Sequence, residues 1–176
     1  MERSTPPSAP SLPMKLLPST ELFIDAARVE FEPLVGMWPK SIGGKVLPIG
    51  ASVFGDLFFQ RPEGNVQKLD VIEGGVHHAA FHLGEFTLLL GSQYWRDTHL
   101  MSHGAGLARR RGLARRKGQF FGFTRHPFHD GRIDWNSLTC FDAVEWHAIC
   151  AKALDRRPGP TGSQTRTARV RRPVDG

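Results

Sequence analysis

Short apolar segments between residues 45 and 81, separated by glycine- and proline-containing turns, form the clearest hydrophobic pattern in the chain. "KVLPIGAS" leads into "VFGDLFFQ", and the following "RPEGN" carries proline and glycine where a hairpin turn needs them. "VQKLDVI" then alternates apolar and polar residues, and "EGG" turns the chain into "VHHAAF". Together with the short extended segment "TELFID", these segments predict an antiparallel β-meander of about four to five strands.

Helical spacing of apolar residues appears on both sides of this meander. "AARVEFEPLVGMW" predicts a helix that Pro39 stops, and Pro33 within it requires the helix to begin close by. "GEFTLLLGSQYW" predicts a second helix. The residues expected on its buried face are Phe86, Leu89, Leu90 and Tyr94.

The last part of the patterned region combines a strand with the strongest helical signal. "QFFGF" predicts a strand, and "FDAVEWHAICAKAL" predicts a helix with Asp142 near its start, where a negative charge interacts favourably with the helix dipole. Strands followed by helices, without regular alternation of the two, predict an α+β fold in which the meander packs against helices. The apolar stripe expected on the last helix comprises Trp146, Ile149, Cys150 and Ala153.

The chain divides into one ordered domain and two tails. Residues 1–19 are rich in proline and serine, and residues 155–176 contain three prolines, three glycines and almost no apolar residues. Both tails are predicted to be disordered, which leaves residues 20–154 as the folded domain. The chain shows no signal peptide or membrane span, and Cys140 and Cys150 are poorly placed for a disulfide bond. These features predict a cytoplasmic protein with free thiols.

The formal net charge of +6 is unevenly distributed along the chain. Residues 103–118 hold six Arg or Lys and no acidic residue, a charge of +6, while residues 155–176 hold six Arg and two Asp, a charge of +4. Subtracting both from the total leaves −4 for the remaining 138 residues. The folded body is therefore predicted to be mildly acidic, with its basic residues in one loop and one tail.

The segment "TRHPFHDGRIDW" concentrates residue types that bind metals, above all His126, His129 and Asp130. Metal ligands must converge, and the chain has neither an HExxH motif nor a cysteine cluster that would support such a site. It also lacks a GxSxG nucleophile motif and the glycine-rich loops that bind phosphate. We therefore expect no metal, cofactor or catalytic residue. A metal-dependent hydrolase centred on these three residues stays a minor alternative.

Three stretches that together span residues 20–154 resemble one protein family. The first is "FIDAARVEFEPLVGMW", and the second, "PIGASVFGDLFFQRPEGNVQKLDVIEGGVH", contains an FGD-L-F core at residues 54–58 and an LD pair at residues 69–70. The third is "GQFFGFTRHPFHDGRIDWNSLTCFDAVEWHAICAKAL", an aromatic strand followed by a glycine-bearing loop and a final helix. Their order and spacing resemble the C-terminal, GAD-like-associated immunity domain of bacterial proteins that neutralise DNase effectors of the type VI secretion system.

This resemblance implies a protein without a reaction of its own, which binds a cognate secreted toxin and blocks it. A DNase tends to present a basic cleft to its polyanionic substrate, so a mildly acidic body has the favourable sign of charge. The loop over residues 125–134 is then a scaffolded surface loop of the kind that carries binding. The expected contact residues are Asp56, Arg125, His126, His129, Asp130, Arg132 and Asp134.

The alternative from a different functional class is a nucleic-acid-associated regulatory protein. Clustered arginines neutralise phosphates and release counterions, which gives affinity without sequence specificity. The basic loop lacks the interleaved aromatic residues of a single-strand binder and contains no recognisable recognition helix. The residues that carry this alternative, together with the tail, are Arg109, Arg110, Arg111, Arg115, Arg116 and Lys117.

Overall fold

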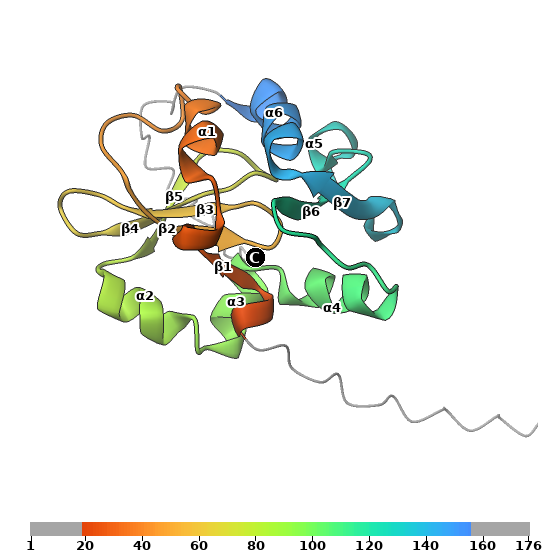
Figure 1. The fold of residues 1–176 in the computed structure, drawn as a ribbon, viewed down its shortest axis with the longest axis horizontal. Coiled ribbons are helices and arrows are strands. Elements are labelled where there is room, and N and C mark those ends of the chain that lie inside the picture. Colours follow the sequence, from red (N-terminus) through yellow and green to blue (C-terminus); the bar gives the residue numbers. More distant parts are fainter. Residues whose placement is uncertain (1–18, 156–176) are drawn as a thin grey trace, which may run out of the picture.

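Five antiparallel strands form the main sheet of the computed structural model, which describes residues 19–155 (Figure 1). Each strand pairs with the next one along the chain, so the sheet is a simple meander. The α+β fold class and the predicted meander are therefore confirmed. The strands are β1 (Phe23–Asp25), β2 (Leu47–Ser52), β3 (Leu57–Gln60), β4 (Val66–Leu69) and β5 (Val76–Ala80).

Pro48 lies within β2, where a proline removes one donor from the hydrogen-bond ladder. β1 pairs with β2 only between Gly50 and Ser52, so Pro48 has a neighbouring strand on one side alone. The register between β2 and β3 also shifts between Pro48 and Gly50, as at a β-bulge. The proline is therefore tolerated because it sits beyond the reach of β1 and beside an irregularity in the pairing.

A second, two-stranded sheet consists of β6 (Gln119–Phe123) and β7 (Leu138–Asp142). β6 confirms the strand predicted from "QFFGF". β7 was not predictable in the same way because it is only partly buried and runs directly into the last helix. The backbone N–H of Phe121 donates to the carbonyl oxygen of Val53 at 2.8 Å, which attaches this sheet to the turn between β2 and β3.

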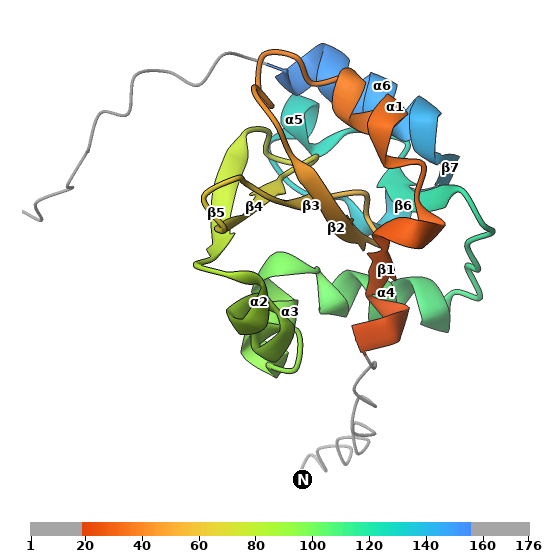
Figure 2. The same cartoon turned by 60° about the vertical axis from the view of Figure 1, so that its left-hand side comes forward.

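Helices cover both sides of the main sheet, as Figures 1 and 2 show. α1 and α6 pack together on one side, and α2, α3 and α4 lie on the other. Pro33 occupies the first turn of α1, where proline is tolerated. These helices are α1 (Phe31–Gly36), α2 (Leu83–Leu89), α3 (Gln93–His99), α4 (Ser102–Arg110) and α6 (Ala143–Leu154).

The single helix predicted across "GEFTLLLGSQYW" is wrong, because the chain forms two helices there. α2 ends at Leu89, and Ser92 begins α3 by accepting a hydrogen bond from the backbone N–H of Trp95 at 3.3 Å. The break changes the helical phase. Trp95 therefore takes the buried position, and Tyr94, predicted to be buried, is 82% exposed.

The loop predicted over residues 103–118 is also wrong in its first half, which forms α4. Gly112 adopts a positive φ of 70° and ends this helix. Its N–H donates to the carbonyl oxygen of Arg109, and the N–H of Leu113 donates to that of Ala108, the pair of bonds that defines a Schellman motif. Gly104 lets α4 pack closely, because a Cβ at this position would collide with the ring of Trp135. Gly112 therefore ends α4 and Gly104 allows its close packing, although in the sequence these glycines seemed to interrupt a helix.

Ser19 and Asp155, which flank the predicted domain of residues 20–154, are both among the described residues. Ser19 begins the short helix η1 (Ser19–Glu21). The carboxylate of Asp155 accepts hydrogen bonds from the backbone N–H of Lys40 at 3.2 Å and from both the N–H and the hydroxyl of Ser41 at 2.9 Å. The disorder predicted for residues 1–18 and 156–176 lies outside the described residues. Between residues 19 and 155, no helix combines the length and apolar composition needed to cross a membrane.

The close contact between the second sheet and α6 requires glycine at position 122. A Cβ on Gly122 would lie 2.7 Å from ring atoms of both Phe141 and Trp146. We expect Gly122→Ala to lower the free energy of unfolding by about 2 kcal/mol, because two buried rings would have to move. Gly36→Ala is the matched control: apart from its chain neighbours and the backbone of its own helix, no atom lies within 4 Å of the added Cβ, and alanine should leave α1 unchanged or slightly more stable. Urea unfolding of both variants measures the difference, and equal stabilities would contradict this account.

Candidate functional site

A groove of about 540 Å³ lies beside α5 (Pro127–Asp130), within the segment that the sequence singled out. Its apolar lining comes from Phe123 of β6, Phe141 of β7 and Ile149 of α6. Figure 1 shows α5 next to α6, so residues from three parts of the chain form one concave surface. The remaining lining comes from the segment that leads into and forms α5, namely Thr124, Arg125, His126, His129 and Asp130.

Two exposed apolar side chains accompany this groove. Phe128 of α5 is 45% exposed, and Ile149 of α6 is 39% exposed. The prediction that Ile149 belongs to the buried stripe of the last helix is wrong, and the side chain instead lines the groove. Ala153 is likewise only partly buried. The buried face of α6 consists of Trp146, His147, Cys150 and Leu154.

His126 shapes the groove by fixing the start of α5. Its Nδ1 accepts a hydrogen bond from the backbone N–H of Phe128 at 3.2 Å, and its Nε2 lies 3.1 Å from the carbonyl oxygen of Val71, to which it donates. The imidazole also packs on the ring of Trp146, with the ring centroids 5.6 Å apart. Burial lowers the pKa of His126, consistent with a neutral imidazole that donates through one nitrogen and accepts through the other. Gly131 has a positive φ of 67° and ends this single helical turn.

These bonds leave His126 without a ring nitrogen for a metal ion. In the part of the chain from residue 19 to residue 155, no group of three or more His, Cys, Asp or Glu side chains is arranged to hold a metal. His129 and Asp130 are exposed on α5, while His126 points into the protein. The described residues therefore do not bring His126, His129 and Asp130 together as a set of metal ligands.

The predicted contact residues separate into surface and interior groups. Arg125, His129 and Asp130 are exposed and line the groove together. Arg132 is exposed outside the lining, and Asp134 begins η3 (Trp135–Ser137) by accepting a hydrogen bond from the N–H of Asn136 at 3.0 Å. His126 belongs to the wall of the groove but is only 4% exposed.

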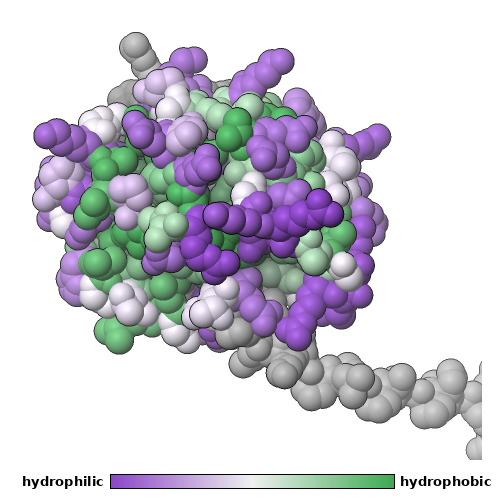
Figure 3. All heavy atoms as spheres, in the orientation of Figure 1, coloured by the Kyte–Doolittle hydropathy of each residue, from purple (hydrophilic) through white to green (hydrophobic). Residues whose placement is uncertain are grey.

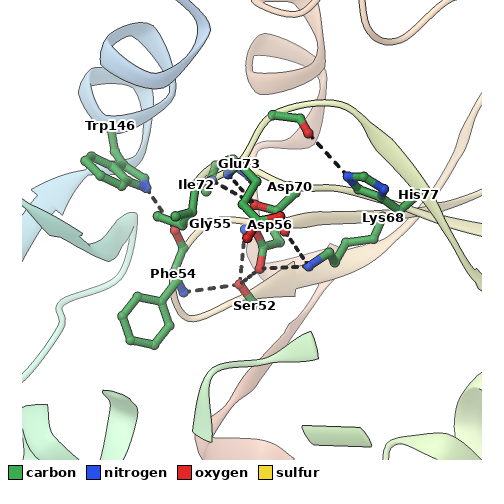
Figure 4. A network of polar contacts seen from close by, with 12 residues as sticks. Ser52, Phe54, Gly55, Asp56, Lys68, Asp70, Ile72, Glu73, His77 and Trp146 are labelled. Carbon is green, nitrogen blue, oxygen red and sulfur yellow. Dashed lines mark hydrogen bonds and ion pairs between the residues drawn. The ribbon is translucent and has the colours of Figure 1, made fainter. Parts of the chain in front are cut away.

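Asp56 is 2% exposed, so its prediction as a contact residue is wrong. One carboxylate oxygen accepts a hydrogen bond from the hydroxyl of Ser52 at 3.0 Å, and the other accepts one from the backbone N–H of Val71 at 3.1 Å. Lys68 lies 4.0 Å from Asp56 and donates to Asp70 at 2.8 Å (Figure 4). Asp56 is therefore a structural residue of the interior, and its interactions join the turn after β2 to the end of β4.

The buried carboxylates and Lys68 shift one another's ionisation. Burial raises the pKa of Asp56 to about 6, although the charge of Lys68 opposes this shift. Burial alone would also raise the pKa of Asp70, but the charge and hydrogen bond of Lys68 outweigh it and lower that pKa. Desolvation likewise acts to lower the pKa of Lys68, and the two carboxylates overcome it and raise that pKa. None of these three residues lines the groove, so the network acts as internal structure.

The basic residues of the nucleic-acid alternative are not equivalent. The guanidinium groups of Arg109, Arg111 and Arg115 all contact other parts of the chain. Arg110, Arg116 and Lys117 are exposed, and their side chains form no ion pair or hydrogen bond within residues 19–155. Half of the predicted set therefore has no internal polar partner among the described residues.

His147 is the buried polar residue that the sequence pattern missed. Its Nδ1 accepts a hydrogen bond from the indole N–H of Trp38 at 3.1 Å, and its Nε2 donates to the carbonyl oxygen of Gly55 at 2.9 Å. The neighbouring Trp146 donates its indole N–H to the carbonyl oxygen of Phe54 at 2.8 Å. The only sequence signal was position, since His147 immediately follows a residue of the apolar stripe.

Comparisons with known proteins add little to this description. No family model matches the chain, and no curated protein matches its sequence. Among solved structures, the crystal structure of Atu4351 from Agrobacterium tumefaciens is similar, with 14% sequence identity and a TM-score of 0.44. The alignment covers 69% of this chain and 62% of that one, so this chain spans less than two thirds of that protein. A likeness at this level carries no functional argument.

Burial of His147 predicts a specific pH dependence of stability. Burial lowers its pKa to about 4 from an ordinary value of 6.5, so the unfolded chain binds a proton more readily than the folded chain between these two values. The contribution of His147 to the free energy of unfolding is therefore present above pH 6.5 and falls by about 3 kcal/mol as the pH drops toward 4.

The variant His147→Leu isolates this contribution. At pH 7 we expect it to be destabilised by about 2 to 4 kcal/mol, because the indole N–H of Trp38 and the carbonyl of Gly55 lose their partner. The difference from the wild type should shrink by about 3 kcal/mol at pH 4. Asp56, with its raised pKa, contributes stability that is lost as pH rises toward 6, but this effect is common to both proteins and cancels. A pH-independent difference in urea unfolding would contradict the assignment.

Proposed function

We propose that this chain is a non-enzymatic immunity protein that binds a cognate DNase effector of the type VI secretion system and neutralises it. The observation that carries the proposal is the groove beside α5, where exposed apolar side chains adjoin charged ones on a preformed frame. The family resemblance of the sequence over residues 20–154 supplies the kind of partner. The groove itself supplies the contact surface.

The composition of the groove suits a protein partner. Specific interfaces combine a desolvated apolar centre, often aromatic, with a polar rim that contributes hydrogen bonds. Ile149 lines the groove and Phe128 is exposed on α5 beside it, so these two side chains fit the central role. Arg125, His129 and Asp130 fit the rim. A groove of this size accommodates a few anchoring side chains of a larger interface, which commonly buries about 800 Å² on each partner.

Rigidity of the frame also supports binding. α5 is held at its start by His126, and α6 is held by Trp146 and His147, so the walls of the groove do not have to form on binding. Preorganisation lowers the entropic cost of association and therefore favours tight complexes. The rim itself carries both signs of charge, Arg125 beside Asp130, so the apolar centre supports this site more strongly than a match of net charge does.

Stoichiometric inhibition is the first expected result. When the purified chain is added to its cognate DNase effector, to be sought among the products of neighbouring genes, DNA cleavage should fall linearly and stop at about one equivalent, because a tight inhibitor acts by occupancy. The chain alone, supplied with Mg²⁺ or Mn²⁺, should leave the DNA intact. Cleavage by the chain itself, or no inhibition and no complex with that DNase, would reject the proposed function.

Charged substitutions test the position of the binding site. Phe128→Asp combined with Ile149→Asp should raise the dissociation constant at least about 30-fold, because both side chains are expected at the desolvated centre. Leu88→Asp combined with Tyr94→Asp is the matched control, since it adds the same charge at two residues that are 78% and 82% exposed on α2 and α3. Titration calorimetry compares the two. Loss of binding in the control alone would show that the binding site lies on the α2–α3 face, without contradicting the proposed function.

A further inference from the structure

The six basic residues between α4 and β6 divide into a structural set and a free set. Arg109 pairs with Glu21 at 3.3 Å, Arg111 donates to the carbonyl oxygen of Trp135 at 2.8 Å, and Arg115 donates to that of Gln119 at 2.7 Å. The free set is Arg110, Arg116 and Lys117, whose side chains form no ion pair or hydrogen bond within residues 19–155. The proposed function uses none of these three cations.

The free cations are held on a well-defined backbone. Arg110 is the last residue of α4, immediately before the Schellman motif that Gly112 closes. Arg116 and Lys117 lie in a turn in which the N–H of Arg116 donates to the side chain of Gln119 and the N–H of Gln119 donates to the carbonyl oxygen of Arg116. Figure 2 shows this segment running along the outside of the molecule from α4 to β6.

Neighbouring charges add to this positive surface. Arg115 extends over the ring of Phe121 at 5.5 Å, and burial lowers its pKa, with the positive charge of Arg28 lowering it further. Arg28 ends η2 (Ala26–Arg28) and is exposed. Asp142 lies opposite Gln119 in the second sheet, but its carboxylate accepts N–H bonds from the start of α6 and pairs with none of these cations. Long hydrophilic side chains dominate the region between β1 and α4 in Figure 3.

We propose that Arg110, Arg116 and Lys117 form a basic edge that binds the phosphate backbone of nucleic acid without reading its sequence. Two of the three are arginines, whose planar guanidinium groups match phosphate oxygens. The segment over residues 103–118 exposes no large apolar side chain, so it offers neither a stacking platform for bases nor an anchor for a membrane. This inference is independent of the proposed function.

The expected signature is a steep dependence of affinity on salt. Each phosphate contact on double-stranded DNA adds roughly 0.9 to the slope of log affinity against log salt concentration. Three contacts would therefore weaken binding by about 40-fold between 50 and 200 mM salt. The test uses the full chain and a short DNA duplex of arbitrary sequence, with binding measured by fluorescence anisotropy across that salt range.

Two triple variants separate the basic edge from net charge. Arg110→Gln, Arg116→Gln and Lys117→Gln together should reduce the slope by roughly 2.7 and weaken binding at least about tenfold at low salt. The matched control removes the same three charges elsewhere, at the exposed Lys40, Lys45 and Lys152. It should leave the slope nearly unchanged. The basic residues of the C-terminal tail are the same in all three proteins, so their contribution cancels.

Several results would overturn the inference. Equal slopes in the wild type and the basic-edge variant, or equal losses in both variants, would show that these residues do not contact phosphates. Binding of polyglutamate or phosphatidylserine vesicles as tightly as DNA, with the same dependence on the basic edge, would assign the surface to another class of partner. The single variants Arg110→Gln and Arg116→Gln, each expected to reduce the slope by roughly one, repeat the test if the triple variant does not fold.

Discussion

The turn over residues 53–56 is the point on which the whole domain depends. The carbonyl oxygens of Val53, Phe54 and Gly55 accept hydrogen bonds from Phe121, Trp146 and His147, so three consecutive acceptors bind the second sheet and α6. Each of these groups is buried and would be costly to leave unpaired. The positive φ of 97° at Gly55 turns the backbone sharply here. One tight turn therefore joins the main sheet to both the second sheet and α6.

The position of this turn determines the shape of the groove. Trp146 donates to the turn with its indole nitrogen and packs against His126 with its ring, so it transmits the position of the main sheet to α5. His126 completes the connection by donating to Val71, the residue whose N–H binds Asp56. Exposed residues of α5 and α6 are thereby placed by buried hydrogen bonds, and interior substitutions far from the groove are expected to alter it.

The predictable part of the fold and the missed part differ in physical origin. The meander was readable because each strand has its own apolar pattern and each turn its own glycine or proline. α4 was missed because its apolar face is built from small residues, Gly104, Ala105 and Ala108, which carry little hydrophobic signal. For the candidate site, composition was enough to locate the segment over residues 125–130. It could not show which side chains of this segment face inward, because that depends on the hydrogen bond between His126 and Val71, which lies far away in the sequence.

The same distinction applies to every charged residue that the sequence marked as functional. Asp56 and Arg111 resemble contact residues in the sequence, yet buried or backbone partners already satisfy them. A charge whose hydrogen-bonding groups are satisfied internally has little left to offer a ligand, and displacing its partner would cost free energy. Arg125 at the groove and Arg116 at the basic edge have no such internal bonds among the described residues. Selection among functional candidates therefore follows from counting satisfied donors and acceptors, a quantity that only the folded structure determines.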